Sequence, residues 1–258
     1  MADAPPRRRS RATFASVLGE LLLTAGALVL LFVVWQLWVG DIIIGAQNNA
    51  KGAALSQQWE AMPPPEPPAP TKAPDGTTAV ALPATPPHPA DAEIFANMHI
   101  PRFGDDYDVN MAGGTSRART LDKIGIGLYT ESKMPGEVGN FALAGHRTTW
   151  GKPFNKLDKL KLNDAIVVET RDGWYTYRFR TLEYVKPTQT DVLLDVPQMP
   201  DLSTGERYIT MTACSPLYSL AERIVAYGVF EGFQPRADGP PASLAPVDVA
   251  TPSAEGAR

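Results

Sequence analysis

A run of twenty uncharged residues from Leu21 to Gly40 constrains this chain more than any other feature. A helix of that length is about 30 Å long, which matches the hydrocarbon core of a bilayer. The run also exceeds the ~7–15 apolar residues of a cleaved signal peptide, although the small residues Gly45 and Ala46 leave cleavage open as an alternative. We therefore expect a transmembrane anchor over residues 17–40.

The charges that flank the run predict its orientation. Four arginines precede it: Arg7, Arg8, Arg9 and Arg11. Asp41 follows it, and Trp35 and Trp38 lie near its far end, where aromatic rings favour the membrane interface. Because basic segments stay on the cytoplasmic side, residues 1–16 are predicted to be cytoplasmic. Everything after the span is then extracellular, as in a single-pass protein of the cell membrane.

Proline separates this span from the rest of the chain. Eleven of the 25 prolines lie between Met62 and Pro89. Because proline fixes φ and lacks an N–H donor, such a segment extends instead of packing. We expect residues 41–90 to form an extracytoplasmic Pro-rich stalk, and residues 235–258 to form a disordered tail. The remaining residues, 91–234, suffice for one compact domain.

Composition excludes one class of function and directs attention to one side chain. The formal net charge is -4, whereas a nucleic-acid-binding domain would normally carry a basic stripe. The single cysteine, Cys214, cannot form an intramolecular disulfide. A lone thiol outside the cell is a liability unless it has a use, so Cys214 is a candidate functional residue.

The domain reads as short strands joined by turns. β-Branched and aromatic residues are enriched in six segments: 94–100, 140–146, 164–170, 174–185, 207–214 and 222–233. Asp172-Gly173 is a hairpin signal between two of them, and the segment between His146 and Asp164 suits a short helical turn. Many short strands without intervening helices predict an all-β fold, either a sandwich or a closed barrel.

Cys214 ends one of the predicted strands. Side chains alternate between the two faces of a strand. The apolar face carries Ile209, Met211 and Ala213. The more polar face carries Tyr208, Thr210, Thr212 and Cys214. A free cysteine is often a small buried hydrophobe, so this position alone leaves both a structural and a reactive thiol open.

Two further side chains could complete a site around Cys214. Arg223 begins the next strand, so a hairpin would return it to the Cys214 end, and His146 ends its own strand. Each alone could be structural. The other histidines are weaker candidates, because His88 lies in the predicted stalk and His99 inside an early strand. Together the three side chains offer a nucleophile, an acid or base, and an oxyanion donor.

These residues also carry a family resemblance. TMTAC (210–214) resembles the TLxTC signature of sortases, with Arg223 in the place of the sortase arginine, and NFALAGHR (140–147) resembles the segment that supplies the sortase histidine. PGEVGNFALAGHRTTWGKPF (135–154) and PRFGDDYDV (101–109) are similar to class E, actinobacterial sortases. The chain departs from that pattern at Gly127-Leu128-Tyr129, where a Gly-His-Tyr run is usual, and at Ala213.

The resemblance implies a closed eight-stranded β-barrel and a cysteine transpeptidase. The thiolate of Cys214 would attack the Thr–Gly bond of an LAxTG-like C-terminal sorting signal on a secreted protein. His146 would protonate the leaving amine, and Arg223 would hold the substrate backbone or the oxyanion. Lipid II or another amine would then resolve the thioacyl enzyme. No cofactor or metal is implied, and Asp105, Asp106 and Asp108 are expected to form a solvated turn.

Three alternatives remain open. An L,D-transpeptidase also uses cysteine and histidine, but it would be expected to show a Gly-Cys pair where this chain has Ala213-Cys214. A sortase that polymerises pilins and a membrane-tethered binding domain without catalysis fit the same segments. For any of these functions, residues 91–233 are expected to fold alone.

Overall fold

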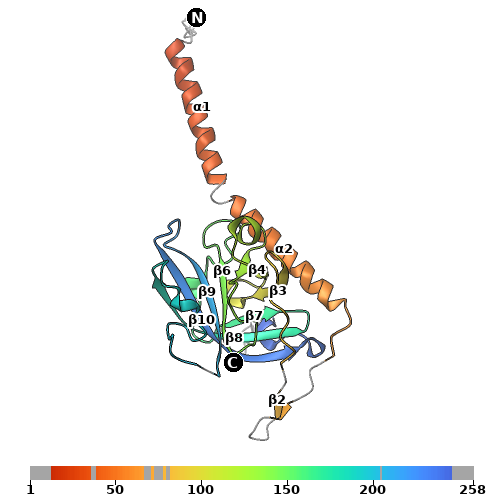
Figure 1. The fold of residues 1–258 in the computed structure, drawn as a ribbon. Coiled ribbons are helices and arrows are strands. Elements are labelled where there is room, and N and C mark those ends of the chain that lie inside the picture. Colours follow the sequence, from red (N-terminus) through yellow and green to blue (C-terminus); the bar gives the residue numbers. More distant parts are fainter. Residues whose placement is uncertain are drawn as a thin grey trace, which may run out of the picture.

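Eight strands close into a barrel in the order β10-β8-β7-β3-β4-β5-β6-β9 (Figure 1). The structure is a computed structural model that describes residues 13–35, 39–66, 71–72, 78–79, 82–203 and 205–245. The helices and longer elements are α1 (Phe14–Val34), α2 (Gly40–Glu60), β1 (Thr71–Lys72), β2 (Thr78–Ala79), β3 (Ile94–His99), β4 (Asp108–Gly113), β5 (Ile126–Leu128), β6 (Gly139–Gly145), β7 (Ala165–Glu169), β8 (Gly173–Val185), β9 (Arg207–Ser215) and β10 (Glu222–Pro235). Short helical turns are η2 (Pro101–Phe103), η3 (Arg117–Leu121), η4 (Leu157–Lys159), η5 (Thr190–Leu193), η6 (Arg236–Asp238) and η7 (Ala242–Leu244). The predicted closed eight-stranded barrel is confirmed, and the alternative prediction of a β-sandwich is wrong.

Strand direction determines which side chains share one end of the barrel. β6 and β9 pair in parallel, so their carboxyl ends lie at the same end. β10 runs antiparallel to β9 and therefore begins at that end. His146 follows β6, Cys214 is the second-last residue of β9, and Arg223 is the second residue of β10. We call this the site end of the barrel.

The barrel interior is filled by the alternate residues of each strand. Phe141 and Leu143 of β6 and Ile209 and Met211 of β9 belong to one buried apolar cluster. Because side chains alternate, Ala142 and its even-numbered neighbours face outward. The predicted apolar face of 207–214 is therefore the core face, and the predicted polar face points away from the core.

α1 is long and apolar enough to cross a membrane. It has 21 residues and a mean hydropathy of 2.5, and none of its most apolar window is buried against the rest of the chain. The interpretation of α1 as a membrane span rests on its length and composition. The four arginines and Trp38, on which the predicted orientation depends, lie outside the described residues.

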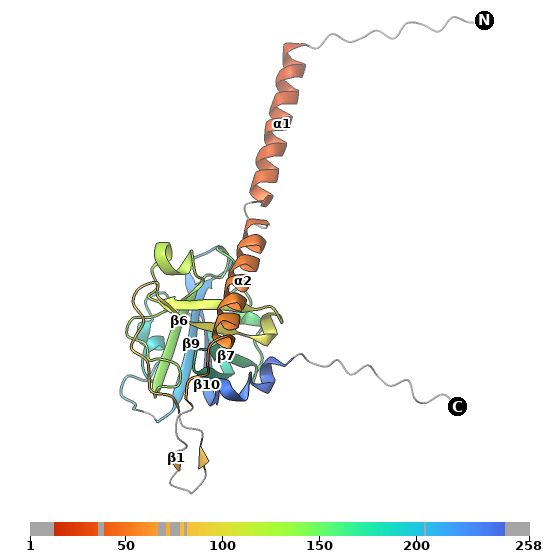
Figure 2. The ribbon, with the colours of Figure 1, turned by 90° about the vertical axis from the view of Figure 1, so that its right-hand side faces the viewer.

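α2 lies along the barrel wall, which differs from the stalk expected over residues 41–90 (Figure 2). Gly52 approaches β4 so closely that a Cβ there would collide with the Asp108 backbone. Near the end of the helix, Trp59 is buried. Small residues, not an apolar stripe, make this contact, and the hydrophobic pattern of 40–60 therefore gave no helix signal.

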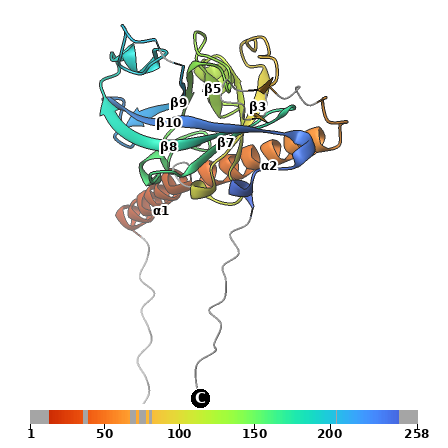
Figure 3. The ribbon, with the colours of Figure 1, turned by 90° about the horizontal axis from the view of Figure 1, so that it is seen from below.

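The chain after β10 also packs on the barrel, although residues 235–258 were expected to be a disordered tail. Arg236 is buried and donates to Glu169 Oε1 at 2.7 Å. Its guanidinium lies over the rings of Trp59 and Trp174, at 5.7 and 4.6 Å from the ring centroids. Arg236 thus joins α2, the barrel and the chain end, and Figure 3 shows α2 and this end on one side of the barrel. Residues 246–258 lie outside the described part of the chain.

Candidate functional site

Cys214 and Arg223 are direct partners across two neighbouring strands. The pairing of β9 with β10 places Cys214 opposite Arg223. Side chains of residues opposite each other in antiparallel strands project from the same face, with Cβ atoms about 4.5–5.5 Å apart. The Cys214 side chain is a free, partly exposed thiol. The hairpin predicted from sequence therefore brings these two residues together.

His146 joins them from the other side of β9. The parallel pairing of β6 with β9 ends with Ala144 opposite Thr212, and His146 follows two residues later, just past the end of β6. The fold thus brings the three predicted site residues to the same end of the barrel, on neighbouring chain segments.

Asp122 holds the His146 ring. The Nε2 atom of His146 lies 2.6 Å from Oδ1 of Asp122, and both side chains are mostly buried. The carboxylate accepts a hydrogen from Nε2, which leaves Nδ1 as the nitrogen available for proton transfer. Asp122 follows η3 in a loop 24 residues upstream, and no pattern in the sequence indicated it.

The Arg223 guanidinium is anchored at one nitrogen. Nη1 donates to the carbonyl oxygens of Glu222 and Leu220, at 2.8 and 3.2 Å. Among the described residues these are its hydrogen-bond partners, so Nε and Nη2 keep their hydrogens free. A guanidinium presents five N–H donors in a rigid fork, and the unused side of this one is suited to a carbonyl or an oxyanion.

A second arginine ties the chain after His146 to the chain after Cys214. Arg147 is buried and its Nη1 donates to Ser215 Oγ at 3.0 Å, while Nη2 lies 3.9 Å from Asp158. The neighbours of the two predicted site residues are therefore bonded to each other. This crosslink fixes the spacing between the chain segments that carry His146 and Cys214.

The Gly-His-Arg sequence owes its glycine to packing. A Cβ on Gly145 would lie 2.7 Å from the ring of Phe154, so only glycine fits where that ring covers β6. Phe154 N in turn donates to His146 O at 3.0 Å. The segment 145–154 is therefore a compact loop that holds the His146 backbone.

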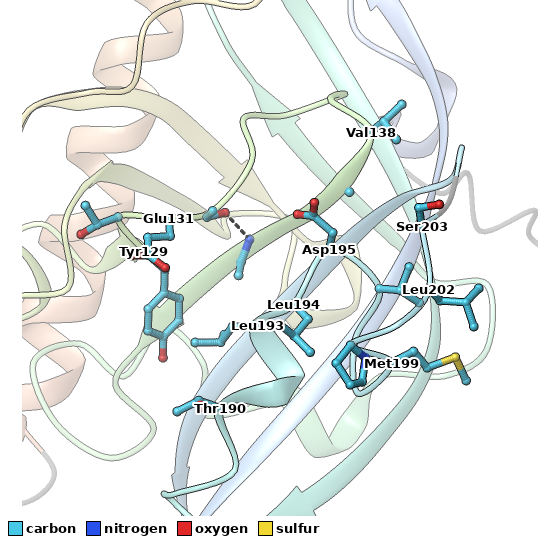
Figure 4. Close-up of a pocket in the computed structure, with 16 residues that line it drawn as sticks. Tyr129, Glu131, Val138, Thr190, Leu193, Leu194, Asp195, Met199, Leu202 and Ser203 are labelled. Atoms are coloured by element: carbon cyan, nitrogen blue, oxygen red, sulfur yellow. Dashed lines mark hydrogen bonds between the residues drawn. The ribbon is translucent and has the colours of Figure 1, made fainter.

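A groove lies on the outer face of β6, and Cys214, His146 and Arg223 are not among the residues that line it (Figure 4). The cavity has a volume of about 750 Å³ and lies between β6 and the segment that joins β8 to β9. Its apolar lining includes Val138, Ala142, Leu193, Leu194, Val196, Met199 and Leu202. Glu131 and Asp195 add carboxylates. Apolar side chains therefore share the lining with hydroxyls and carboxylates, a mixture that suits a peptide.

Tyr129 connects this groove to the site residues. It lines the cavity, and its hydroxyl lies 2.9 Å from Thr212 Oγ1, two residues before Cys214 on the same face. From sequence, Tyr129 was noted only within the Gly127-Leu128-Tyr129 departure. The structure adds Tyr129 to the candidate site as a residue that both lines the groove and contacts the Cys214 strand.

The acidic turn near residue 105 differs in part from the expectation. Asp105 and Asp106 are exposed, but Asp108 is partly buried in β4, where Asn97 donates to it. Burial raises the pKa of Asp108 to about 6. Among the described residues no group of three His, Cys, Asp or Glu side chains could hold a metal ion.

Comparison with known proteins gives one family. A model of the sortase domain matches residues 98–231. Sortase SrtE1 of Streptomyces coelicolor is 34% identical over 249 residues, which cover 94% of this chain and 64% of the relative, so the chain spans under two thirds of that protein. Sortase SrtE2 of the same organism is 30% identical over 226 residues, covering 85% of this chain and 83% of the relative.

Solved structures agree with these relatives. Sortase E1 from Streptomyces coelicolor, crystallised with a tripeptide in the active site, is 36% identical with a TM-score of 0.56, and the match covers 60% of this chain and 99% of that one. Sortase E from Streptomyces avermitilis is 33% identical with a TM-score of 0.55, again covering 60% and 99%. The SrtF sortase of Corynebacterium diphtheriae is 31% identical with a TM-score of 0.58, covering 64% and 98%.

Proposed function

Since the chain belongs to the sortase family and its relatives are class E sortases, we propose that it is a membrane-anchored cysteine transpeptidase acting on LAxTG-like sorting signals. The observation that carries this proposal is the pairing of Cys214 with Arg223 at the end of the barrel where His146 follows β6, with a peptide-sized groove on the outer face of that strand. Secreted proteins with a C-terminal sorting signal would be its substrates.

The proposed reaction exchanges one amide bond for another through a thioester. The Cys214 thiolate attacks the carbonyl carbon of the signal's threonine, and the tetrahedral adduct collapses with loss of the glycine amine. His146 gives that amine the proton it needs to leave. An incoming amine then attacks the thioester, loses a proton to His146, and releases Cys214 as a thiolate.

Arg223 and Asp122 have supporting roles in the proposed reaction, Arg223 toward the substrate carbonyl and Asp122 toward the His146 ring. The free Nε and Nη2 hydrogens of Arg223 would bind the carbonyl oxygen as negative charge develops on it. Asp122 would act as a positioning residue that keeps the His146 ring turned toward the leaving amine. Neither role requires a cofactor or a metal.

The groove supplies the peptide site of the proposal. Its apolar wall would bind the aliphatic residues of the signal, and Tyr129 would lie near the scissile bond. The tripeptide in the active site of the Streptomyces coelicolor sortase E1 supports a peptide as the ligand of the proposed site. The acceptor would be a cell-wall precursor amine, with lipid II as the first candidate, in anchoring and not in pilus polymerisation.

α1 supports the proposed location. It would hold the protein in the cell membrane as a single span, with the N-terminus in the cytoplasm and the barrel outside. The proline-rich segment that follows α2 would then also lie outside the cell.

Cleavage of a fluorescence-quenched LAxTG peptide tests the function. The full-length protein in detergent is compared with Cys214→Ala, and with Ser219→Ala, whose hydroxyl lies outside the predicted site. Cleavage by the parent and by Ser219→Ala, with none by Cys214→Ala, is the expected result. Peptide binding without cleavage by the parent would favour the tethered binding domain, and cleavage that survives in Cys214→Ala would remove Cys214 as the nucleophile.

A further inference from the structure

The membrane-side end of α2 is attached to the site end of the barrel. A Cβ on Gly45 would lie 3.4 Å from the carbonyl oxygen of Gly151, and Asn48 Nδ2 donates to Trp150 O at 3.5 Å. Both α2 residues lie in the first half of that helix. Their partners belong to the loop that follows His146, so the start of α2 lies beside that loop.

Chain length then limits how far the site end can be from α1. Five residues lie between Val34 and Gly40, so the chain from one to the other spans at most about 20 Å when fully extended. Gly45 lies about 7.5 Å further along α2. Figures 1 and 2 both show the turn between β9 and β10 at the end of the barrel from which α1 departs.

Large apolar side chains are exposed at this end. In the turn between β9 and β10, the exposed fractions are 47% for Leu217, 69% for Tyr218 and 71% for Leu220. Trp150, 40% exposed, lies in the loop after His146. The Arg147–Ser215 hydrogen bond joins the two segments at their bases. We call Trp150, Leu217, Tyr218 and Leu220 the apolar rim.

A single exposed leucine needs no explanation, but three large apolar residues within four positions of one turn do. The groove for the sorting signal does not account for them, because none of the four lines it. α2 extends the same character toward the membrane, since Ile42 and Ile43 in its first turn are also exposed. Leucine, tyrosine and tryptophan are the side chains that suit the boundary between headgroups and acyl chains.

We propose that the apolar rim is a membrane-binding surface that seats the site end of the barrel on the lipid bilayer. The proposal rests on the proposed membrane anchoring through α1. The partner is lipid, because the rim lies within a short chain length of a membrane-spanning helix. Cys214, directly below the turn that carries Leu220, then works next to the headgroup layer.

Photocrosslinking to lipid tests the proposal with the full-length protein in phosphatidylethanolamine–phosphatidylglycerol vesicles. A benzoylphenylalanine replaces Leu220 in one sample and Leu217 in a second, so that one poorly folded variant does not end the test. Val138 is the matched control, because it is 45% exposed but precedes β6 at the opposite end of the barrel. Leu28, within α1, reports on anchoring itself.

The expected result is lipid adducts at Leu28, and adducts at Leu220 and Leu217 at least fivefold above Val138 by mass spectrometry. Adducts at Leu28 with rim positions no higher than Val138 would overturn the rim and leave the anchor standing. Adducts at Val138 that exceed those at the rim would show that the other end faces the bilayer. No adducts at Leu28 would remove the anchor, and the rim proposal with it.

Discussion

The hydrogen bond between His146 and Asp122 could not be predicted from the sequence motif that contains His146, because Asp122 lies outside that motif. A histidine that transfers a proton must present one particular nitrogen, and the carboxylate of Asp122 determines which one. Arg147 has a comparable supporting role, because its bond to Ser215 sets the distance between two strand ends. The proposed chemistry therefore depends on more side chains than Cys214, His146 and Arg223.

Replacing Asp122 with asparagine should lower kcat for peptide cleavage about tenfold or more, with little change in KM. The expectation follows because a mispositioned ring loses part of the ~10²–10⁴-fold contribution of a general acid, while peptide binding lies elsewhere. Asp122→Glu should restore part of the activity, and Asp106→Asn, at an exposed aspartate, should change nothing. Steady-state kinetics measures all three. A rise in KM at constant kcat would instead place Asp122 in substrate binding.

At the scale of elements, α2 and the chain end form part of the folded domain. Ser56 of α2 donates to Glu169 at 2.5 Å, and His99 contacts the same carboxyl oxygen at 2.8 Å. Burial opposes ionisation of Glu169, but hydrogen bonds from His99, Ser56 and Arg236 outweigh it and lower its pKa. A buried carboxylate with this many donors joins α2, β3, β7 and η6 into one unit.

Gly52→Ala should destabilise the protein, because the added methyl group collides with the Asp108 backbone where α2 touches β4. Overpacking of this kind costs about 1–3 kcal/mol in the free energy of unfolding. Urea denaturation of the parent and the variant measures it. Lys51→Ala, at the exposed neighbouring position, is the control and should leave the midpoint unchanged. Equal midpoints for all three proteins would mean that α2 is not held against the barrel.

The pH dependence of stability should show the burial of Asp108. Its folded pKa of about 6 exceeds the unfolded value, so the folded state holds the proton more tightly. This group therefore favours folding below its unfolded pKa, and its contribution is lost as the pH rises through about 6. The size is on the order of 1–3 kcal/mol.

Asp108→Asn should remove that loss, so that stability between pH 4 and 6 rises more steeply in the variant than in the parent. Glu169, whose pKa is lowered, contributes the opposite slope at lower pH, where its stabilisation is lost as the pH falls through its folded pKa. Denaturation curves at intervals of half a pH unit provide the comparison. Parallel curves for parent and variant would show that Asp108 does not carry this effect.

At the scale of the whole molecule, the packed unit extends beyond the segment 91–234 that the sequence predicts as the catalytic domain. α2 lies before that segment and Arg236 after it, and both contact Glu169 or its surroundings. The domain boundaries predicted at residues 41, 90 and 235 remain proposals. The structure itself has residues of 40–60 and of 235–245 in contact with the barrel.

A fragment of residues 40–245 should be more stable than one of residues 91–233. The shorter fragment leaves the Glu169 carboxyl without Ser56 and Arg236, and truncating one partner of a buried charged pair costs about 3–5 kcal/mol. Both fragments are to be unfolded in urea and followed by circular dichroism. Equal free energies would support the independent folding predicted for 91–233 and would make α2 an accessory.

Local sequence features were sufficient to predict six of the eight barrel strands, although not β4 or the short β5, and to select Cys214, His146 and Arg223 as candidate site residues. Alternation within 207–214 separated the core face from the Cys214 face, and a hairpin between neighbouring strands required Arg223 to return to Cys214. Strand periodicity and turn chemistry act over a few residues, so one sequence can reveal them. The apolar run that forms α1 is local in the same way.

Only the tertiary structure decided the parts that depend on distant contacts. Asp122 meets His146 from a loop 24 residues away, Arg147 meets Ser215 across 68 residues, and Ser56 meets Glu169 across 113. α2 is held by glycine and small polar residues, and Arg236 is held by aromatic rings and a carboxylate on other elements. Such contacts leave no periodic pattern in the chain, because the partner that makes each residue necessary is brought to it only by the closed barrel.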